Sequence, residues 1–248
     1  MISICMATYN GEKYITEQVN SILPQLSEND ELIVSDDGST DGTLKILESF
    51  NDKRIKIFHH KRFGNRNKNT NNNYYSLTQN FSNAMQHAKG DCIFLSDQDD
   101  VWLPNKINAM LSLLQKWDLV ICDAWVVDEQ LNKLFLISKN KTPRRGFFKS
   151  IFSGTAYGCC CALTKKLKDI AVPIPENVIG HDYFIKLLAE KLNSVHFMSE
   201  PLMLYRRHSE TATSLDKSAN SCINKFIYRL HLFLESNKRF KNPMQKQV

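Results

Sequence analysis

The sequence predicts an α/β protein with a mostly parallel central sheet flanked by helices, and two observations carry that prediction. Short apolar runs alternate with amphipathic stretches through the first half of the chain, an order typical of parallel strands joined by crossover helices. Polar clusters directly follow three of these apolar runs, and ligands of such sheets bind beyond the carboxyl ends of the strands. The 248 residues can bury the core of one large domain or two small ones.

Each element of the first half follows from a local pattern. Continuous apolar runs predict strands, and apolar residues at helical spacing predict helices, while turn-forming residues mark the ends. The expected strands are 2–7, 31–35, 55–58 and 92–95, and the expected helices are 12–23, 44–50, 74–88 and 104–117. Residues 62–73 are rich in asparagine and basic residues, which predicts a surface loop, either a lid or an ordinary insertion.

The second half carries weaker patterns. A strand is expected over 118–127, helices over 164–170 and 183–192, and two further strands over 195–198 and 202–205. Small residues over 154–163 predict close packing against another backbone. We expect one compact domain over 1–215 and a distinct tail over 216–248.

The tail has the pattern of a basic amphipathic helix. Ile223, Phe226, Ile227 and Leu230 recur at i, i+3, i+4 and i+7, with basic residues among them. Such a helix suits an anionic membrane surface, at roughly 1 kcal/mol per basic residue near it. Packing on the domain or binding a protein partner is the alternative.

Composition excludes several classes of protein. Seven cysteines without a C-x-x-C pair favour apolar core residues in a reducing compartment over a disulfide framework or a zinc site. We expect neither a signal peptide nor a membrane span, because the chain has no basic leader and no apolar run near about 18 residues. Nucleic acid is not an expected partner, since the positive charge is local and no reading motif is present.

The strand over 92–95 ends in three carboxylates, Asp97, Asp99 and Asp100. Carboxylates this close raise one another's pKa unless a partner is present, and a hard cation such as Mg²⁺ is a suitable partner that keeps positions open for phosphates. P-loop, dinucleotide-binding, esterase-elbow and EF-hand motifs are absent. The hypothesis is a metal–phosphate site at the end of a buried strand, and a solvated acidic turn is the alternative.

Residues 4–11, 34–43 and 94–102 together resemble family 2 glycosyltransferases, which have the GT-A fold. The resemblance covers roughly residues 1–210. The acids with a glutamine between them, followed by Trp102, are similar to those of bacterial enzymes that build O-antigen or capsule repeat units, rhamnosyl- and glucosyltransferases among them.

The resemblance implies a nucleotide site at the sheet edge. In it Thr8 and Tyr9 line the pocket for base and ribose, Asp36 and Asp37 bind the pyrimidine, and Asp97 contacts the ribose or lies beside the metal. A capped turn is the alternative for the two acids at 36 and 37, because such residues cap helices well.

The resemblance also implies Mn²⁺ or Mg²⁺ as the cofactor. Asp99 coordinates it on the diphosphate, and Asp100 supports the metal site or the acceptor side. His208 is a further candidate ligand, since imidazole suits Mn²⁺ better than Mg²⁺. Arg206 and Arg207 are candidates for positive charge on the leaving diphosphate, with a solvated strand end as the alternative.

Asp182 stands where the family has its catalytic base, and His181 replaces the acid that the family commonly has before it. In this reading Asp182 takes the proton from the acceptor hydroxyl, while His181 and Trp102 lie on the acceptor side. One displacement of this kind inverts the anomeric centre. A helix cap is the alternative for His181 and Asp182.

The sequence therefore predicts an inverting, metal-dependent glycosyltransferase of bacterial surface polysaccharide synthesis. The expected donor is a UDP-hexose or dTDP-rhamnose, and the expected acceptor is a lipid-diphosphate-linked saccharide. We expect a cytoplasmic protein held at the inner-membrane surface by its tail. The alternatives are an inactive assembly protein of the same fold and a sugar nucleotidyltransferase, although the latter needs a glycine-rich basic loop that 8–11 lacks.

Overall fold

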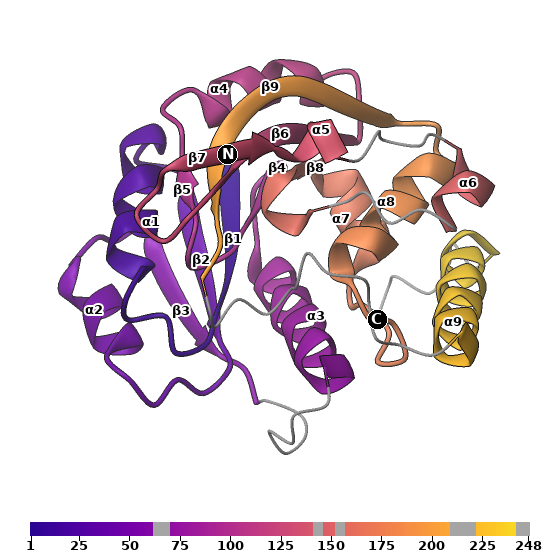
Figure 1. Cartoon of the computed structure of the whole chain (residues 1–248), viewed down its shortest axis with the longest axis horizontal. Helices are drawn as coiled ribbons and strands as arrows, with labels where there is room; N and C mark the ends of the chain where they lie inside the picture. The colour runs from indigo at the N-terminus through magenta and orange to yellow at the C-terminus, as the bar shows by residue number, and fades with distance from the viewer. Residues whose placement is uncertain (62–69, 141–145, 152–156, 209–221, 242–248) are drawn as a thin grey trace.

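The computed structural model describes residues 1–61, 70–140, 146–151, 157–208 and 222–241. Within these residues nine strands form one curled sheet with helices packed around it (Figure 1). The strand order is β3-β2-β1-β4-β8-β6-β9-β5, and β7 pairs with β6 outside this path. The predicted α/β class is confirmed.

The first half of the chain forms the parallel part of the sheet. The buried strands are almost continuously apolar, as expected where helices or neighbouring elements cover both faces. The amphipathic helix α1 buries Ile15, Val19 and Ile22, and α3 packs against β1 and β2. The elements are β1 (Ile2–Thr8), α1 (Ile15–Ile22), β2 (Glu31–Asp36), α2 (Thr43–Ser49), β3 (Ile55–His59), α3 (Thr70–His87) and β4 (Cys92–Ser96).

The second half mixes strand directions. β8 runs antiparallel between β4 and β6, whereas β6 and β9 pair in parallel. The two strands predicted over 195–198 and 202–205 are one strand, β9, which curls along β6 and reaches β5. The elements are β5 (Val101–Trp102), α4 (Lys106–Leu114), β6 (Leu119–Val127), β7 (Lys133–Leu136), α5 (Ile137–Asn140), α6 (Phe147–Ile151), β8 (Cys161–Thr164), α7 (Lys165–Ala171), α8 (His181–Lys191) and β9 (Val195–Arg206).

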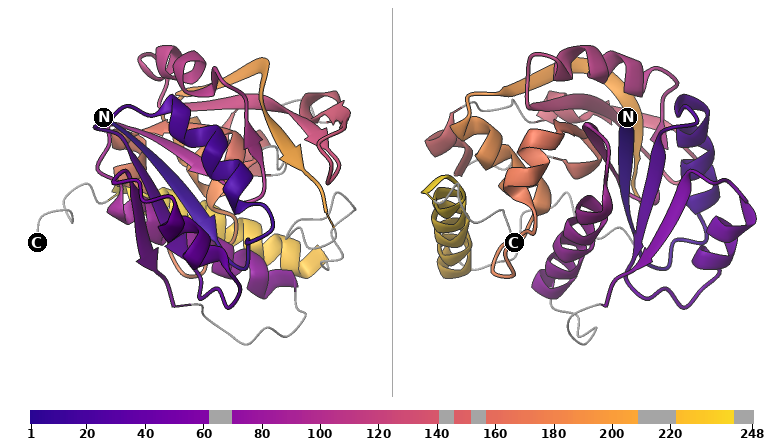
Figure 2. Two further views of the ribbon diagram at one scale, coloured as in Figure 1. Left: turned by 90° about the vertical axis from the view of Figure 1, so that its left-hand side faces the viewer. Right: turned by 180° about the vertical axis from the view of Figure 1, so that it is seen from behind.

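The last described element is α9 (Cys222–Lys241), which packs on α8 and α6 at the end of the molecule opposite α1 and α2 (Figures 1 and 2). Leu232 and Ser236 are fully buried there, while Ile227, Leu230 and Leu234 are more than 40% exposed. The helix therefore packs on the domain and still presents an apolar side. No helix in the described ranges is long and apolar enough to cross a membrane.

Two boundaries differ from the sequence prediction. α3 begins at Thr70 and so includes residues that were assigned to the loop over 62–73, while 62–69 lie outside the described residues. The small-residue stretch over 154–163, described from Tyr157 onward, contains the one-turn helix η2 (Gly158–Cys160) followed by β8. The six described cysteines are all free thiols.

Candidate active site

The three polar clusters predicted to converge do meet at one edge of the sheet. The parallel register pairs Thr8 with Asp36 across β1 and β2, and Met6 with Ser96 across β1 and β4. The segments that follow all three strands therefore leave the sheet side by side, as parallel pairing requires.

The carboxylate oxygens of Asp36 are fully hydrogen-bonded by its own loop and by the end of β1. Its carboxylate accepts hydrogen bonds from the Thr8 hydroxyl (3.0 Å), from the Ser39 hydroxyl (2.6 Å) and from the backbone N–H groups of Gly38 (3.0 Å) and Ser39 (2.8 Å). Asp36 and Thr8 are both almost completely buried. This geometry is the capped turn considered from the sequence, and it fixes the shape of the loop.

Asp37 and Tyr9 stand at the same edge in different environments. Asp37 is 4% exposed and its carboxylate lies 2.6 Å from Nδ1 of His60, a residue just beyond β3. Tyr9 exchanges two backbone hydrogen bonds with the Gln98 amide, at 2.8 and 3.1 Å. A Cβ on Gly11 would lie 2.4 Å from that amide, so a larger residue at position 11 would displace the Gln98 side chain from its place across the loop.

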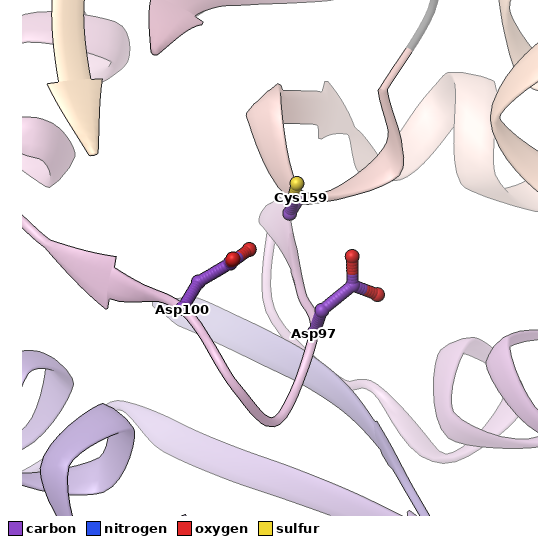
Figure 3. A group of neighbouring side chains, drawn as sticks. All are labelled: Asp97, Asp100 and Cys159. Atoms are coloured by element: carbon purple, nitrogen blue, oxygen red, sulfur yellow. The ribbon is translucent and has the colours of Figure 1, made fainter. Parts of the chain in front are cut away.

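The acidic loop divides its carboxylates between two sides. On one side Asp99 lies 2.9 Å from Nε2 of His208, which follows β9. On the other side the carboxyl groups of Asp97 and Asp100 approach the thiol of Cys159, with all three ligand atoms within 4.8 Å of one another (Figure 3). The three acids predicted to act together thus face two different sets of neighbours.

Burial changes the acidity of the inner pair. Burial, and then the neighbouring charge of Asp99, raises the pKa of Asp97 to about 7. The pKa of Asp100 is raised well above its usual value by burial and by the charges of Asp99 and Asp97. Desolvation and like charges both disfavour the ionised form, so without a cation this pair holds protons that isolated carboxylates would release.

Asp97 and Asp182 line the same pocket. Its volume is about 80 Å³, room for several water molecules. Asp182 lies in the first turn of α8, where its Oδ1 accepts the Tyr183 backbone N–H at 2.8 Å, and burial raises its pKa to about 6. Tyrosines Tyr74, Tyr157 and Tyr205 form much of the remaining wall, with Leu77, Thr78, Gly158, Cys159, Gly180 and His181.

His181 lines the same pocket. Its ring stacks on Phe81 with centroids 3.9 Å apart, and burial lowers its pKa to about 3, so the ring is neutral at physiological pH. Nε2 is buried without a hydrogen-bond partner among the described residues. A Cβ on Gly158 would lie 2.3 Å from that nitrogen, so a glycine at 158 leaves the space that the ring occupies.

Arg206 joins three parts of the fold. It is 4% exposed; its Nε donates to the Asp99 carbonyl at 2.8 Å and its Nη1 to the Glu129 carbonyl at 2.8 Å. It also forms an ion pair with Glu17 and lies over the Tyr14 ring. These contacts connect the acidic loop to α1 and to the β6–β7 turn. Because they already occupy the guanidinium of Arg206, its contact with a diphosphate stays a prediction.

Arg207 and Trp102 lie in different places. The Arg207 guanidinium is 3.4 Å from the hydroxyl of Tyr205, which lines the pocket. Trp102 is 2% exposed, packs near Phe94 and has the Lys106 ammonium 4.2 Å from its ring centroid. Trp102 is thus a core residue rather than one of the pocket-lining residues, because β5 turns its side chain inward.

Four residues of this region carry no functional signal in the sequence. Gln98 stands there as a spacer between acids, and Cys159 as part of an apolar run. The fully buried Lys106 donates to the Cys159 carbonyl at 2.6 Å, and its place in an amphipathic helix gave no signal. Tyr228 of α9 has its hydroxyl 3.2 Å from a Cβ built on Gly180, which brings the tail beside the start of α8.

The side chains of Asp99 and His208 form a pair that could hold a divalent cation. Asp99 and His208 offer a carboxylate and an imidazole within hydrogen-bond distance, a donor set that suits Mn²⁺. The Asp100 carboxyl group is turned away from this pair. Its Oδ1 accepts the Arg206 backbone N–H, and its side chain points toward Asp97.

This chain is similar to known proteins of one family. The family model described as glycosyl transferase family 2 matches residues 3–210. A glucosyltransferase of Escherichia coli, WfgD, is 28% identical over 198 residues, which cover 79% of this chain and 72% of the relative. A dTDP-rhamnosyl transferase of Shigella flexneri, RfbG, is 29% identical over 212 residues, covering 82% and 71%.

Solved structures share the fold. Staphylococcus aureus TarS in complex with UDP-GlcNAc superposes with a TM-score of 0.68 at 20% identity, over 94% of this chain and 66% of that chain. A mannosyltransferase of Pyrobaculum calidifontis, solved with GDP-Man and Mn²⁺, gives a TM-score of 0.58 at 15% identity, covering 95% and 69%. The chain spans about two thirds of the length of these structures.

Proposed function

The chain belongs to glycosyl transferase family 2, and on that premise we propose that it transfers a sugar from a nucleotide-sugar to an acceptor hydroxyl with inversion. The observation that carries the proposal is the pocket that is lined by both Asp97, from the acidic loop, and Asp182 of α8. We assign Asp97 to the donor side and Asp182 to the acceptor side of this pocket.

Asp182 is the proposed general base. Its pKa of about 6 lies close to neutral pH, where a carboxylate is ionised and still a better proton acceptor than an ordinary aspartate. It takes the proton from the acceptor hydroxyl as the oxygen bonds to the anomeric carbon and the bond to the diphosphate breaks. Attack from the face opposite the leaving group inverts that carbon.

Asp99 and His208 are proposed to hold Mn²⁺ or Mg²⁺ on the donor diphosphate, supported by their 2.9 Å contact. A bound cation supplies Lewis-acid stabilisation of the leaving diphosphate. Arg207, beside the pocket tyrosine Tyr205, is the better placed of the two arginines to add positive charge. Asp37, Thr8 and Tyr9 remain the proposed nucleotide edge of the site.

We propose a UDP-hexose or dTDP-rhamnose as the donor and a lipid-diphosphate-linked saccharide as the acceptor, within bacterial surface polysaccharide synthesis. The support is the names of two relatives, one a UDP-Glc:α-D-GlcNAc-diphosphoundecaprenol β-1,3-glucosyltransferase and the other a dTDP-rhamnosyl transferase. The pocket tyrosines fit such substrates, since aromatic side chains combine an apolar face with a polar edge.

A lipid-linked acceptor places the protein at the cytoplasmic surface of the inner membrane, and we propose that α9 makes this contact. Its exposed residues Ile227, Leu230 and Leu234 lie at helical spacing on one side, and Phe148 of the neighbouring α6 is 69% exposed. Arg229 and Lys238 belong to the same helix and suit anionic lipid.

A donor screen tests the proposal. The purified chain is incubated with UDP-glucose, UDP-galactose, UDP-GlcNAc or dTDP-rhamnose and a lipid-diphosphate-linked acceptor, with Mn²⁺ or with EDTA. Transfer from one donor that EDTA abolishes is the expected result. Nucleotide binding with no transfer to any acceptor would favour an inactive assembly protein of the same fold.

A further inference from the structure

A thiol and two carboxyl groups meet on the inner side of the acidic loop. Asp97 and Asp100 come from the loop after β4, and Cys159 comes from η2, a segment about 60 residues further along the chain. Their ligand atoms all lie within 4.8 Å of one another (Figure 3). Asp99 takes no part in this group, because its carboxylate lies against His208 on the other side of the loop.

The group contains an acceptor that the protein leaves unused. Asp100 is 0% exposed. Its Oδ1 accepts the Arg206 backbone N–H at 3.0 Å, while its Oδ2 is buried without a hydrogen-bond partner among the described residues. A buried carboxylate oxygen without a partner is costly, and the carboxyl group of Asp100 points toward the thiol and the second carboxyl group (Figure 3).

We propose that Asp97, Asp100 and Cys159 form a site for a thiophilic divalent cation of the Zn²⁺ class, distinct from the pair Asp99 and His208. Zn²⁺ binds thiolate at about 2.3 Å and carboxylate at about 2.0–2.2 Å, so the ligand atoms must draw together by roughly an ångström to bind. Mg²⁺ is disfavoured here, since it prefers oxygen ligands alone. Binding releases to solvent the thiol proton and the protons that the two carboxyl groups hold without a cation, and it leaves Cys159 as the thiolate.

The surroundings allow entry and leave a position open. Asp97 and Cys159 both line the pocket, so a cation can reach them through it. Three protein ligands leave a fourth tetrahedral position for water or a substrate oxygen. The positive charge that opposes binding is the buried Lys106, which is turned to the Cys159 carbonyl and the Trp102 ring.

Occupation of the site has a consequence that rests on the proposed function. A cation held by Asp97 draws this carboxyl group away from the donor nucleotide and fills part of the pocket that faces Asp182. Zn²⁺ is therefore an inhibitor of transfer in the presence of Mn²⁺, and its effect depends on Cys159.

Direct binding of Cd²⁺, a spectroscopic substitute for Zn²⁺, tests the site without reference to catalysis. Cadmium–thiolate bonds absorb in the ultraviolet, so a titration of the whole chain reports ligation of a cysteine. We expect one equivalent of Cd²⁺ to produce the band and Zn²⁺ to displace it. Cys159→Ser should lose the band and weaken binding about tenfold or more, whereas Cys92→Ser, a half-buried thiol at the start of β4, should keep both.

Asp100→Asn provides a second variant in which every thiol is retained. It should weaken Cd²⁺ binding by about tenfold while circular dichroism shows the native fold. A band of unchanged strength in Cys159→Ser, or no band in the folded wild type, would overturn the proposal. The titration needs no nucleotide-sugar, so a donor screen without transfer would leave the cation site standing. A titration without a band would likewise leave the proposed transferase activity untouched.

Discussion

Two acidic loops leave the same edge of the sheet, and their buried carboxylates differ in how completely they are hydrogen-bonded. After β2, the Asp36 carboxylate receives four hydrogen bonds from two hydroxyls and two backbone N–H groups. After β4, Asp100 keeps one buried oxygen without a partner and burial raises the pKa of Asp97. Both loops looked like ligand sites in the sequence.

The difference separates a structural acid from a functional one. A carboxylate with all its acceptors filled stabilises its loop and has little left to offer a ligand. Carboxyl groups that are buried, close together and incompletely bonded cost stability in the absence of a ligand, as is common at functional sites. The first loop shapes the edge of the pocket, and the second supplies groups that a cation or a donor can use.

The largest expected effect belongs to the pocket acid opposite the second loop. Asp182→Asn should lower the transfer rate by about 10²–10⁴-fold, the usual contribution of a general base, with donor KM nearly unchanged. The Asn side chain can still accept the Tyr183 N–H, and burial raises the pKa of the Asp182 carboxyl group to about 6, so the melting temperature at neutral pH should stay the same or rise, not fall. Steady-state kinetics and thermal unfolding check both statements, and Asp118→Asn, remote from the pocket, serves as the control. Transfer at the wild-type rate would assign the base elsewhere.

The second largest effect is expected in the pH dependence of stability, which should come from Asp97 in the loop after β4. The folded-state pKa of Asp97 is raised to about 7 from 3.8, so the folded protein binds more protons than the unfolded chain between about pH 4 and pH 7. Stability from this group is present below pH 4 and is lost as pH rises toward 7.

Asp97→Asn removes this loss. Measured by denaturant unfolding without divalent cations, the variant should gain about 2–4 kcal/mol on the wild type between pH 4 and pH 8. Asp100 and Asp182 stay in both proteins, but loss of the Asp97 charge removes one cause of the raised pKa of Asp100, so the measured gain belongs to the coupled acids and not to Asp97 alone. Parallel curves for the two proteins would mean that Asp97 is ionised normally.

The first loop should show its role in stability rather than in chemistry. Asp36→Ala leaves two hydroxyls and two backbone N–H groups without their acceptor, at an expected cost of about 2–3 kcal/mol in the free energy of unfolding. Asp128→Ala is a matched control, because Asp128 also accepts three hydrogen bonds in a turn but is solvent-accessible, where water replaces them. Equal losses in the two variants would remove the distinction.

The smallest effect is expected at the link between the loops and β1. Gln98→Ala deletes two hydrogen bonds to the Tyr9 backbone and should cost about 1 kcal/mol in unfolding free energy. Gln86→Ala on the exposed side of α3 should cost less than half as much. A neutral Gln98→Ala variant would show that Tyr9 is positioned without this amide.

The arrangement of the first half could be predicted from the sequence, because it depends on patterns within short segments. Apolar runs and turn residues define β1, β2 and β4, and parallel pairing then requires Thr8, Asp36 and the acidic loop to share an edge. The continuous β9 and the antiparallel β8 were not predictable in the same way, because their partners lie far away in the chain and their short runs fit more than one arrangement.

The division of the acidic loop was also beyond the sequence. Residue spacing places Asp97, Asp99 and Asp100 together but does not say which way each side chain turns. That depends on Cys159 and Arg206, which reach the loop from η2 and β9. The tail illustrates the same limit, since an amphipathic pattern shows that a helix has an apolar side but not that Tyr228 lies beside Gly180.

The central proposal is a cation held between the second loop and the donor diphosphate. Isothermal calorimetry of UDP and of dTDP with the wild type and Asp99→Ala, in Mn²⁺ and in EDTA, measures it. We predict that one nucleotide binds the wild type in Mn²⁺, and that EDTA or the Asp99→Ala substitution each weakens binding by at least about tenfold. Equal affinity of that nucleotide in Mn²⁺ and in EDTA, unchanged by Asp99→Ala, would contradict the account.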